Sequence, residues 1–365
     1  MHNNEIRDKF VFLVIPLLLL IPCILTFVHP DKNAARIELR KIQEFPSIPT
    51  NLRELYLWPK ATDRYIIDHF FMRSLFIREI SKLLYFCHIS ISKEVLIGKD
   101  GWLFLSTNND VIDKHRGIKN LSPEEADTWM NIMSSRVRFL KERGIDCWFI
   151  IIPNKHSIYP EYLPDWCTKV APSLTDTLVQ KLKEQGEIHW IDLRPLLIEA
   201  AKTFAVYGKY NSHWDDMGAY LAYKYIMKKL PGPLNLSPIF EENVRFTYKR
   251  MSGDLARLIN LQNYLTEEKV VAEITKSRVI KKTEVKDYQK ESWTTVTSNR
   301  SARAVILCDS FVYSYMQKYL QESFSYSFFK HHNHMDFDKE MILQQHPDIV
   351  LYIIVERLIP LRLVE

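Results

Sequence analysis

The sequence predicts an α/β fold in which helices cover both faces of a mainly parallel central sheet, preceded by an N-terminal transmembrane helix. Short apolar runs rich in β-branched residues predict buried strands at 147–152, 188–191, 304–307 and 349–355. Stretches with helical periodicity alternate with these runs, as is typical of parallel sheets. The uncharged run 10–28 predicts the transmembrane helix, because roughly 20 apolar residues are enough to cross a bilayer.

Capping and turn residues indicate where the elements begin and end. Residues 95–105 predict a hairpin around Lys99-Asp100-Gly101. Ser122-Pro123-Glu124-Glu125 predicts a helix start, as a capping box with proline at the first helical position, and Gly144 ends that helix. Further helical patterns occur at 63–86, 173–185, 194–204, 215–230 and 312–320. The polar, irregular region 240–300 receives no assignment.

We expect four parts along the chain. They are a cytoplasmic tail (1–9), a transmembrane anchor (10–28), a membrane-proximal linker and helix (29–90), and an α/β domain (91–365). The anchor is expected to stay uncleaved, because the run is long and ends without a small-residue cleavage site. Basic residues flank the run on both sides, so the positive-inside rule does not decide its orientation.

Composition argues against several function classes. The net charge of +5 comes from interspersed charges without a basic tract, so no nucleic-acid partner is expected. The five cysteines show no CxxC spacing, which argues against a zinc site. The run His331-His332-Asn333-His334 lacks metal-ligand spacing and is expected to be an ordinary polar loop. We therefore expect neither a metal nor another cofactor.

Candidate catalytic residues follow the predicted strands. Ser310 lies on a strand-to-helix turn after 304–307, and His213 precedes the helix at 215–230. Because ligands of α/β sheets bind beyond the carboxyl ends of the strands, these residues form a plausible nucleophile–base pair. The alternative for Ser310 is a simple helix cap, and the alternative for His213 is a packed side chain without a catalytic role. Asn154 and Lys155 follow the predicted strand 147–152, and they could simply be loop residues. Glu356 and Arg357 follow the predicted strand 349–355, and they could be a surface ion pair of little energetic weight.

Two blocks of the sequence resemble a known family. Asp309-Ser310-Phe311 resembles the Gly-Asp-Ser block of SGNH-type esterases and acetyltransferases, and Asn211-Ser212-His213-Trp214 resembles their Asp-x-His block. The histidine block comes first here, which is the permuted order of the alginate O-acetyltransferase AlgJ/AlgX family, and the chain looks closer to AlgJ. The resemblance covers roughly residues 60–365 and includes further blocks at Ile97-Gly98-Lys99-Asp100-Gly101-Trp102-Leu103-Phe104, Pro153-Asn154-Lys155 with Tyr159-Pro160, Ile191-Asp192-Leu193-Arg194, Gly253-Asp254-Leu255 and Glu356-Arg357.

The resemblance implies an SGNH hydrolase-like three-layer sandwich and assigns roles in it. Ser310 would be the nucleophile, His213 its general base, and the Ser310 N–H part of the oxyanion hole. The residue expected to orient His213 is an aspartate, and that position is Asn211 here. Another acid could take over this role, and the candidates are Asp192, Asp215 and Asp216. Supporting roles are expected for Asp309, Asn154, Lys155, Glu356 and Arg357.

The resemblance also implies a function. We expect an O-acetyltransferase of a cell-surface or exported polysaccharide, with a membrane-bound O-acyltransferase partner that supplies acetyl. The catalytic domain would lie on the extracytoplasmic or periplasmic side of the inner (cytoplasmic) membrane, held by a single-pass anchor. Two alternatives remain open. One is a carbohydrate acetyl esterase with the same residues, and the other is a weak or inactive scaffold, for which Asn211 is the main argument.

Overall fold

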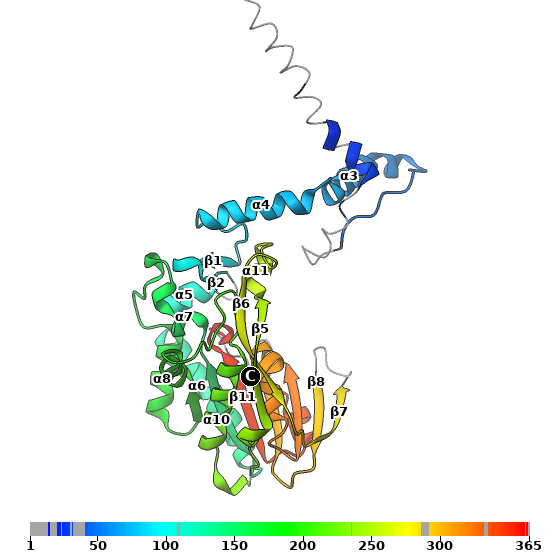
Figure 1. The fold of residues 1–365 in the computed structure, drawn as a ribbon. Coiled ribbons are helices and arrows are strands. Elements are labelled where there is room, and N and C mark those ends of the chain that lie inside the picture. Colours follow the sequence, from blue (N-terminus) through cyan, green and yellow to red (C-terminus); the bar gives the residue numbers. More distant parts are fainter. Residues whose placement is uncertain are drawn as a thin grey trace, which may run out of the picture. The chain divides into compact units, whose positions relative to one another are not determined.

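The chain forms two compact units in a computed structural model, which describes residues 14, 20–22, 24–29, 31, 41–107, 110–234, 236–285, 292–331, 335–361 and 363 (Figure 1). One unit contains Met1–Ile91 and Arg257–Gln262, and the other contains Ser92–Ala256 and Asn263–Glu365. Within the described part of the chain, no helix is both long and apolar enough to cross a bilayer. The predicted tail 1–9 lies outside the described residues, and so does most of the predicted anchor 10–28.

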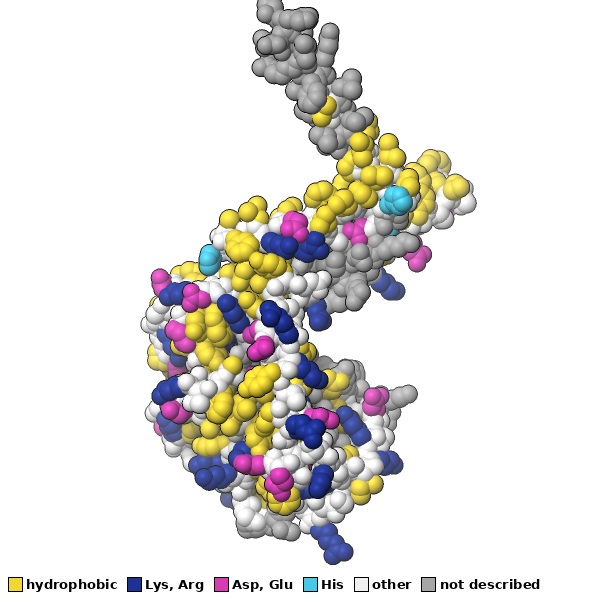
Figure 2. All heavy atoms as spheres, viewed as in Figure 1, with side chains coloured by type: hydrophobic (Ala, Val, Ile, Leu, Met, Phe, Trp, Pro, Cys, Tyr) yellow, Lys and Arg dark blue, Asp and Glu magenta, His cyan; other side chains and the backbone are white. Residues whose placement is uncertain are grey.

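The first unit contains two helices where the sequence pattern 63–86 predicted one. Helix α3 (Leu52–His69) begins at its cap Asn51, whose side chain accepts from the N–H of Glu54. Helix α4 (Arg73–Phe86) starts anew after Met72, because the left-handed backbone of Met72 (φ 56°) interrupts a right-handed helix. Apolar side chains gather on the visible surface of this unit (Figure 2). Phe76, Ile80 and Leu83 of α4 are half exposed or more.

The second unit is built on a seven-stranded sheet with the order β4-β3-β11-β9-β10-β8-β7. The five strands from β4 to β10 are parallel, as predicted, whereas β8 and β7 are antiparallel and make the sheet mixed. The strands are β3 (Asp146–Ile152), β4 (His189–Asp192), β7 (Val279–Val285), β8 (Ser292–Thr297), β9 (Arg303–Cys308), β10 (Tyr326–His331) and β11 (Ile349–Val355).

Helices cover both faces of this sheet, so the predicted three layers are present. Alternate residues of β11 belong to two separate apolar cores, as the two-residue period of a strand requires. One core contains residues of α6 (Pro123–Lys141), α8 (Leu174–Gln185) and α13 (Lys339–Gln344). The other contains residues of α9 (Arg194–Ala201), α10 (Asp216–Lys229), the π-helix Val312–Met316 and α12 (Gln317–Leu320). The capping box of α6 at Ser122 and Glu125 is confirmed.

Smaller elements surround the sheet. The predicted hairpin is confirmed as β1 (Val95–Ile97) and β2 (Leu103–Leu105). Strands β5 (Val244–Ser252) and β6 (Thr266–Ile274) form a separate antiparallel pair in the region that the sequence left unassigned. Most side chains of β5 are exposed, so its sequence carries no clear apolar alternation. The short helices are α5 (Val111–Arg116), α7 (Lys155–Ile158) and α11 (Asp254–Leu258). His331 ends β10, while 332–334 lie outside the described residues.

Candidate active site

The turn after β9 presents the Ser310 hydroxyl at the carboxyl edge of the sheet. Asp309, fully buried, holds this turn: its Oδ1 accepts from the N–H of Phe311 at 2.9 Å and its Oδ2 from the N–H of Val355 at 2.7 Å. Burial raises the pKa of Asp309, although these two N–H groups and Arg357 oppose the change. Ser310 begins the helical stretch, so no preceding helical turn supplies an acceptor for its N–H.

The loop before α10 places His213 against this turn. Trp214, which is fully buried, donates its indole N–H to the carbonyl of Phe311 at 3.2 Å and thereby joins the two segments. The His213 ring packs on Phe311 with 4.7 Å between ring centroids. His213 Nε2 lies 2.9 Å from Ser310 Oγ, a normal hydrogen-bond distance. The structure therefore brings together the two residues that the sequence proposed as nucleophile and base.

The acid that faces His213 is Asp254 and not Asn211. Asp254 Oδ2 lies 3.1 Å from His213 Nδ1 and accepts from Ser212 Oγ at 2.5 Å. Asp254 Oδ1 accepts from the backbone N–H groups of Ser212 at 2.7 Å and Leu255 at 2.8 Å. Because a carboxylate only accepts, Nδ1 carries the proton and Nε2 is left free to accept from Ser310. The predicted orienting role of Asn211 is wrong in this respect.

Asp254 reaches the histidine because Gly253 allows two backbone segments to approach closely. A Cβ atom at Gly253 would collide with the carbonyl group of Tyr210, so only glycine fits there. The block Gly253-Asp254-Leu255 was visible in the sequence, but nothing in its local pattern indicated that it lies beside His213. The region around it was also the one whose strands the sequence did not predict.

The surroundings of Asp254 stabilise its carboxylate form. Burial among protein atoms would raise its pKa, but the hydrogen bond and charge of His213 and the hydrogen bonds from Ser212 outweigh that effect and lower it. About two fifths of its side chain is exposed (41%), and the side chain of His213 is exposed to 19%. Asp254 is therefore an anion, and both side chains keep part of their surface open to solvent.

Asn211 has a different contact. Its amide nitrogen donates to the Tyr315 hydroxyl at 3.1 Å, and the centroid of the Tyr315 ring lies 6.2 Å from that of the His213 ring, with 29° between the two planes. Asn211 thus touches an aromatic side chain on the π-helix beside the candidate base. A π-helical turn of this kind often occurs at functional sites.

The three other acids considered in the sequence are engaged elsewhere. Asp215 caps α10 by accepting from the N–H groups of Met217 and Gly218, both at 3.0 Å. Asp216 pairs with Lys318 at 2.7 Å. Asp192 pairs with the Arg194 guanidinium at 2.8 Å. Each has a structural partner.

Lys155 supports the His213 loop from inside the protein. Its buried ammonium donates to the carbonyl oxygens of Leu103, Gly208 and Lys209, each at 2.7 Å, and to that of Asn211 at 3.3 Å. Burial lowers the pKa of Lys155 well below its usual value, and nearby acids oppose this change. The side chain ties β2 to the segment that carries His213.

Asn154, Glu356 and Arg357 form a neighbouring buried network. Glu356 Oε2 accepts from the N–H of Asn154 at 2.6 Å and from Ser157 Oγ at 2.7 Å. Arg357 donates to Asn154 Oδ1 at 3.3 Å, and its guanidinium lies over the Phe311 ring, 4.9 Å from the centroid. Burial raises the pKa of Glu356, although Arg194 and the two hydrogen bonds oppose this. These residues hold the loops that flank Ser310.

The arrangement can perform nucleophilic catalysis. A hydroxyl, an imidazole and a carboxylate follow one another at hydrogen-bond distances, and a helix N-terminus adjoins the hydroxyl. Among the described residues, no group of three or more His, Cys, Asp or Glu side chains could hold a metal ion.

Known proteins share this fold. The structure of PatB1 from Bacillus cereus superposes with a TM-score of 0.53 at 16% identity, over 72% of this chain and 95% of that one. A structure of the same protein with a sulfonyl adduct gives 0.54 at 17% identity, over 72% and 93%. A DHHW family protein from Eubacterium siraeum DSM 15702 gives 0.50 at 13% identity, over 72% and 89%. At these identities the likeness concerns the fold.

Sequence comparison identifies the family. "Probable alginate O-acetylase AlgJ" of Pseudomonas aeruginosa is 30% identical over 128 residues, which are 34% of this chain. The match spans about a third of that relative's length (30%). A family model described as "SGNH hydrolase-like domain, acetyltransferase AlgX" matches residues 95–332, nearly two thirds of the chain. The chain therefore belongs to the AlgJ/AlgX family of SGNH hydrolase-like acetyltransferase domains.

Proposed function

We propose that this protein is a polysaccharide O-acetyltransferase that works through an acetyl ester on Ser310. The observation that carries the proposal is the continuous chain of contacts from Ser310 Oγ through the His213 ring to Asp254. The membership of the AlgJ/AlgX family supports acetyl transfer as the chemistry. The similarity to the probable alginate O-acetylase of Pseudomonas aeruginosa supports a polysaccharide as the acceptor.

In the first half-reaction Ser310 Oγ attacks the carbonyl carbon of the acetyl donor. His213 Nε2 takes the hydroxyl proton, and Asp254 stabilises the imidazolium that forms, because it is already held as an anion by four hydrogen-bonding contacts. The N–H of Ser310 faces the developing oxyanion at the start of the helix. Collapse of the intermediate expels the donor's leaving group, which takes the proton from His213 and leaves acetyl-Ser310.

The second half-reaction runs the same steps with a sugar hydroxyl. His213 Nε2 removes the proton of the acceptor hydroxyl while its oxygen attacks the acetyl carbon. The bond between the acetyl group and Ser310 breaks, and Ser310 Oγ recovers a proton from His213. One acetyl group has then moved from donor to acceptor, and the site returns to its starting state.

The remaining features of the proposal concern the setting. We place the catalytic domain on the extracytoplasmic side of the inner membrane, with the apolar run 10–28 as its anchor. We further propose a membrane-bound O-acyltransferase partner as the source of acetyl. The apolar length of this run and the family resemblance support these features. Both are testable by accessibility labelling and by co-purification from membranes.

The inactive-scaffold alternative loses its main argument. It rested on Asn211 replacing the aspartate of the family block, whereas Asp254 fills the place behind His213. A serine-directed phosphonate probe tests this point, because it should label the wild type and fail to label Ser310→Ala. If the wild type also stays unlabelled, the site is inactive and the scaffold is correct.

Product analysis separates a transferase from an esterase. The protein is given an activated acetyl ester, with and without a neutral or uronic-acid oligosaccharide, and acetylated sugar and free acetate are both measured. We expect acetylated sugar to increase at the expense of acetate as the acceptor concentration rises. Acetate as the only product at every acceptor concentration would make this protein an esterase.

A further inference from the structure

A cavity lies on the same edge of the sheet as Ser310, away from the catalytic contacts. It has a volume of about 560 Å³, within the range of small-molecule sites, and its lining contains neither Ser310, His213 nor Asp254. Most of its lining comes from α7 after β3, the start of α9 after β4, and the loop 160–169, and the rest comes from Lys99, from His115 of α5 and from Asp176 of α8. In the strand order β4-β3-β11-β9, the end of β3 is two strand spacings, about 10 Å, from the end of β9 that carries Ser310.

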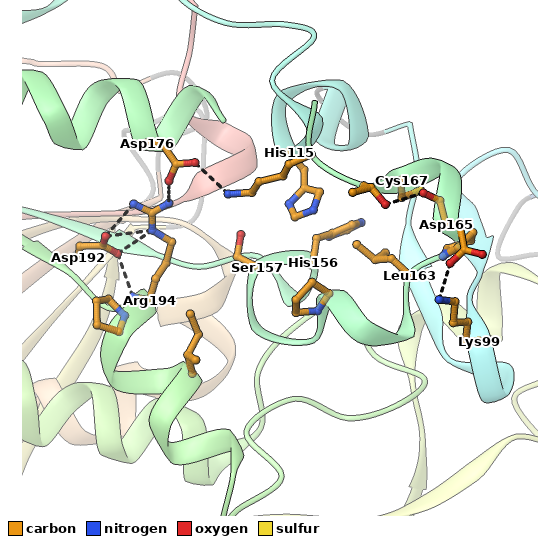
Figure 3. Close-up of a pocket in the computed structure, with 16 residues that line it drawn as sticks. Lys99, His115, His156, Ser157, Leu163, Asp165, Cys167, Asp176, Asp192 and Arg194 are labelled. Carbon is orange, nitrogen blue, oxygen red and sulfur yellow. Dashed lines mark hydrogen bonds and ion pairs between the residues drawn. The ribbon is translucent and has the colours of Figure 1, made fainter. Parts of the chain in front are cut away.

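The charges of this cavity cancel one another. Figure 3 shows Arg194 with its carboxylate partners at one end and Lys99 with Asp165 at the other. Three cations meet three carboxylates in the lining: the distances are 2.6 Å for Lys99–Asp165, 2.9 Å for Lys169–Asp176, and 2.5 and 2.8 Å from Arg194 to Asp176 and Asp192. No net charge remains to attract a charged ligand, and the pairs leave apolar surface of proline, Leu163 and Ile198 between them.

The middle of the cavity offers hydrogen-bond acceptors that the protein does not satisfy. His156 is 2% exposed; its Nε2 lies 2.9 Å from the carbonyl of Leu105 and must carry the proton, and its Nδ1 has no partner among the described residues but is closed off from solvent, so a ligand does not reach it. His115 is 8% exposed, faces His156 at 5.8 Å between ring centroids, and has no hydrogen bond from any described group (Figure 3). Ser157 donates its proton to Glu356, which leaves its oxygen lone pairs for a ligand.

Both imidazoles are neutral at physiological pH, which leaves His115 with an unprotonated ring nitrogen that can accept from a ligand. Burial lowers the pKa of His115 to about 4 and that of His156 well below its usual value. A buried acceptor without a donor costs free energy, so a ligand hydroxyl or a bridging water that donates to it gains affinity. A ligand that fits must therefore carry several O–H donors, little charge and apolar C–H faces for the proline and aliphatic walls.

We propose that this cavity binds a neutral saccharide unit, and that it holds part of the acceptor polymer two or more strand spacings, at least about 10 Å, from Ser310. The second half of the proposal rests on the proposed acetyl transfer, whereas the binding itself does not. A buried path joins the cavity to the catalytic turn: Ser157 and the N–H of Asn154 share Glu356 Oε2, and Arg357 links Asn154 to Phe311.

The binding test uses full-length Ser310→Ala protein, which cannot turn over. Cellotetraose, maltotetraose and chitotetraose serve as neutral probes, tetramannuronate serves as the charged probe, and calorimetry measures affinity at low and high salt. Ile198→Trp fills the cavity from α9, and Glu199→Trp places the same side chain on the exposed neighbouring position as the matched control. We expect at least one neutral probe to bind without salt dependence, and Ile198→Trp to weaken it about tenfold or more while Glu199→Trp does not.

Three results would overturn the binding proposal. The first is equal binding by the two tryptophan variants, and the second is no binding of any neutral probe at millimolar concentration. The third is tighter, salt-sensitive binding of tetramannuronate, which would make the ligand an anion.

Measurements of acetyl transfer with protein that retains Ser310 test separately whether the cavity holds the acceptor. We expect Ile198→Trp to raise KM for the acceptor while hydrolysis of an activated acetyl ester is unchanged. Equal transfer by both tryptophan variants would remove the acceptor role. Binding without any transfer by the wild type would instead refute the proposed acetyltransferase and leave the saccharide site standing.

Discussion

Two polar clusters occupy the same edge of the sheet, and they differ in how completely their groups are satisfied. Around Lys155 and Glu356, each charged group is buried and surrounded by carbonyl, N–H or hydroxyl partners. Around Ser310, the hydroxyl and the imidazole remain partly exposed and make a single directional contact with each other. The first cluster stabilises the loops, whereas the second keeps hydrogen-bonding capacity that a substrate can use.

This difference gives a way to tell supporting residues from catalytic residues among the polar side chains that follow parallel strands. Position at the carboxyl edge is shared by both clusters and does not separate support from catalysis. Exposure and unused hydrogen-bonding capacity do separate them, since a reacting group must meet the substrate. The following predictions test this distinction.

Ser310→Ala should have the largest effect. Loss of the nucleophile should reduce turnover of an activated acetyl ester by on the order of 10⁵-fold, with little change in the free energy of unfolding. Steady-state kinetics and chemical denaturation measure the two quantities. Ser314→Ala, an exposed serine on the following π-helix, is the matched control and should behave as wild type.

Asp254→Asn should reduce the same turnover by roughly 10³- to 10⁴-fold, because an amide neither stabilises the imidazolium nor guarantees the correct tautomer. The loss should appear in kcat across the working pH range. An activity close to wild type would show that another group orients His213.

Lys155→Met should act on stability instead of chemistry. It leaves four carbonyl groups without their shared donor, so the free energy of unfolding should fall by about 3 kcal/mol. Urea denaturation measures this change. Lys202→Met, at an exposed lysine, should be neutral. An equally small effect at Lys155 would contradict its role as a support.

Asp215→Asn should change how stability depends on pH. Burial raises the pKa of Asp215 to about 7, although the N–H groups that it caps oppose this. Between the unfolded pKa and this value the folded protein binds the extra proton, so wild-type stability falls as pH rises. Asparagine keeps the cap without titrating, and should add roughly 1–2 kcal/mol near pH 8 and little near pH 4. Denaturation at both pH values should show no such gain if Asp215 titrates normally.

Asn211→Asp should have the smallest effect, within a few-fold of wild-type turnover. The new carboxylate can accept from the Tyr315 hydroxyl, while Asp254 continues to face His213. A large increase in ester turnover would mean that a negative charge at position 211 is what the site lacks. That outcome would return the orienting role to this position.

Apolar patterning and local capping in the sequence were enough to predict much of the central sheet and its helices. Its apolar runs predicted β3, β9 and β11, because strands buried on both faces must be apolar throughout, and a shorter apolar run indicated the edge strand β4. Its capping box located the start of α6, since capping is a local interaction. Ser310 and His213 followed from the rule that parallel strands end at one edge, and their blocks indicated the family.

The carboxylate that faces His213 could be identified only from the three-dimensional structure. Asp254 is 41 residues from His213 in the chain, and the two meet because Gly253 packs against the backbone of Tyr210. Such a long-range approach leaves no periodic or local signal in the sequence, whereas Asn211 lay at the expected spacing and suggested a defect. The strands β7, β8 and β10 were also not predicted. β10 lies between β9 and β8 in the sheet, so its place depends on contacts with segments outside its own sequence.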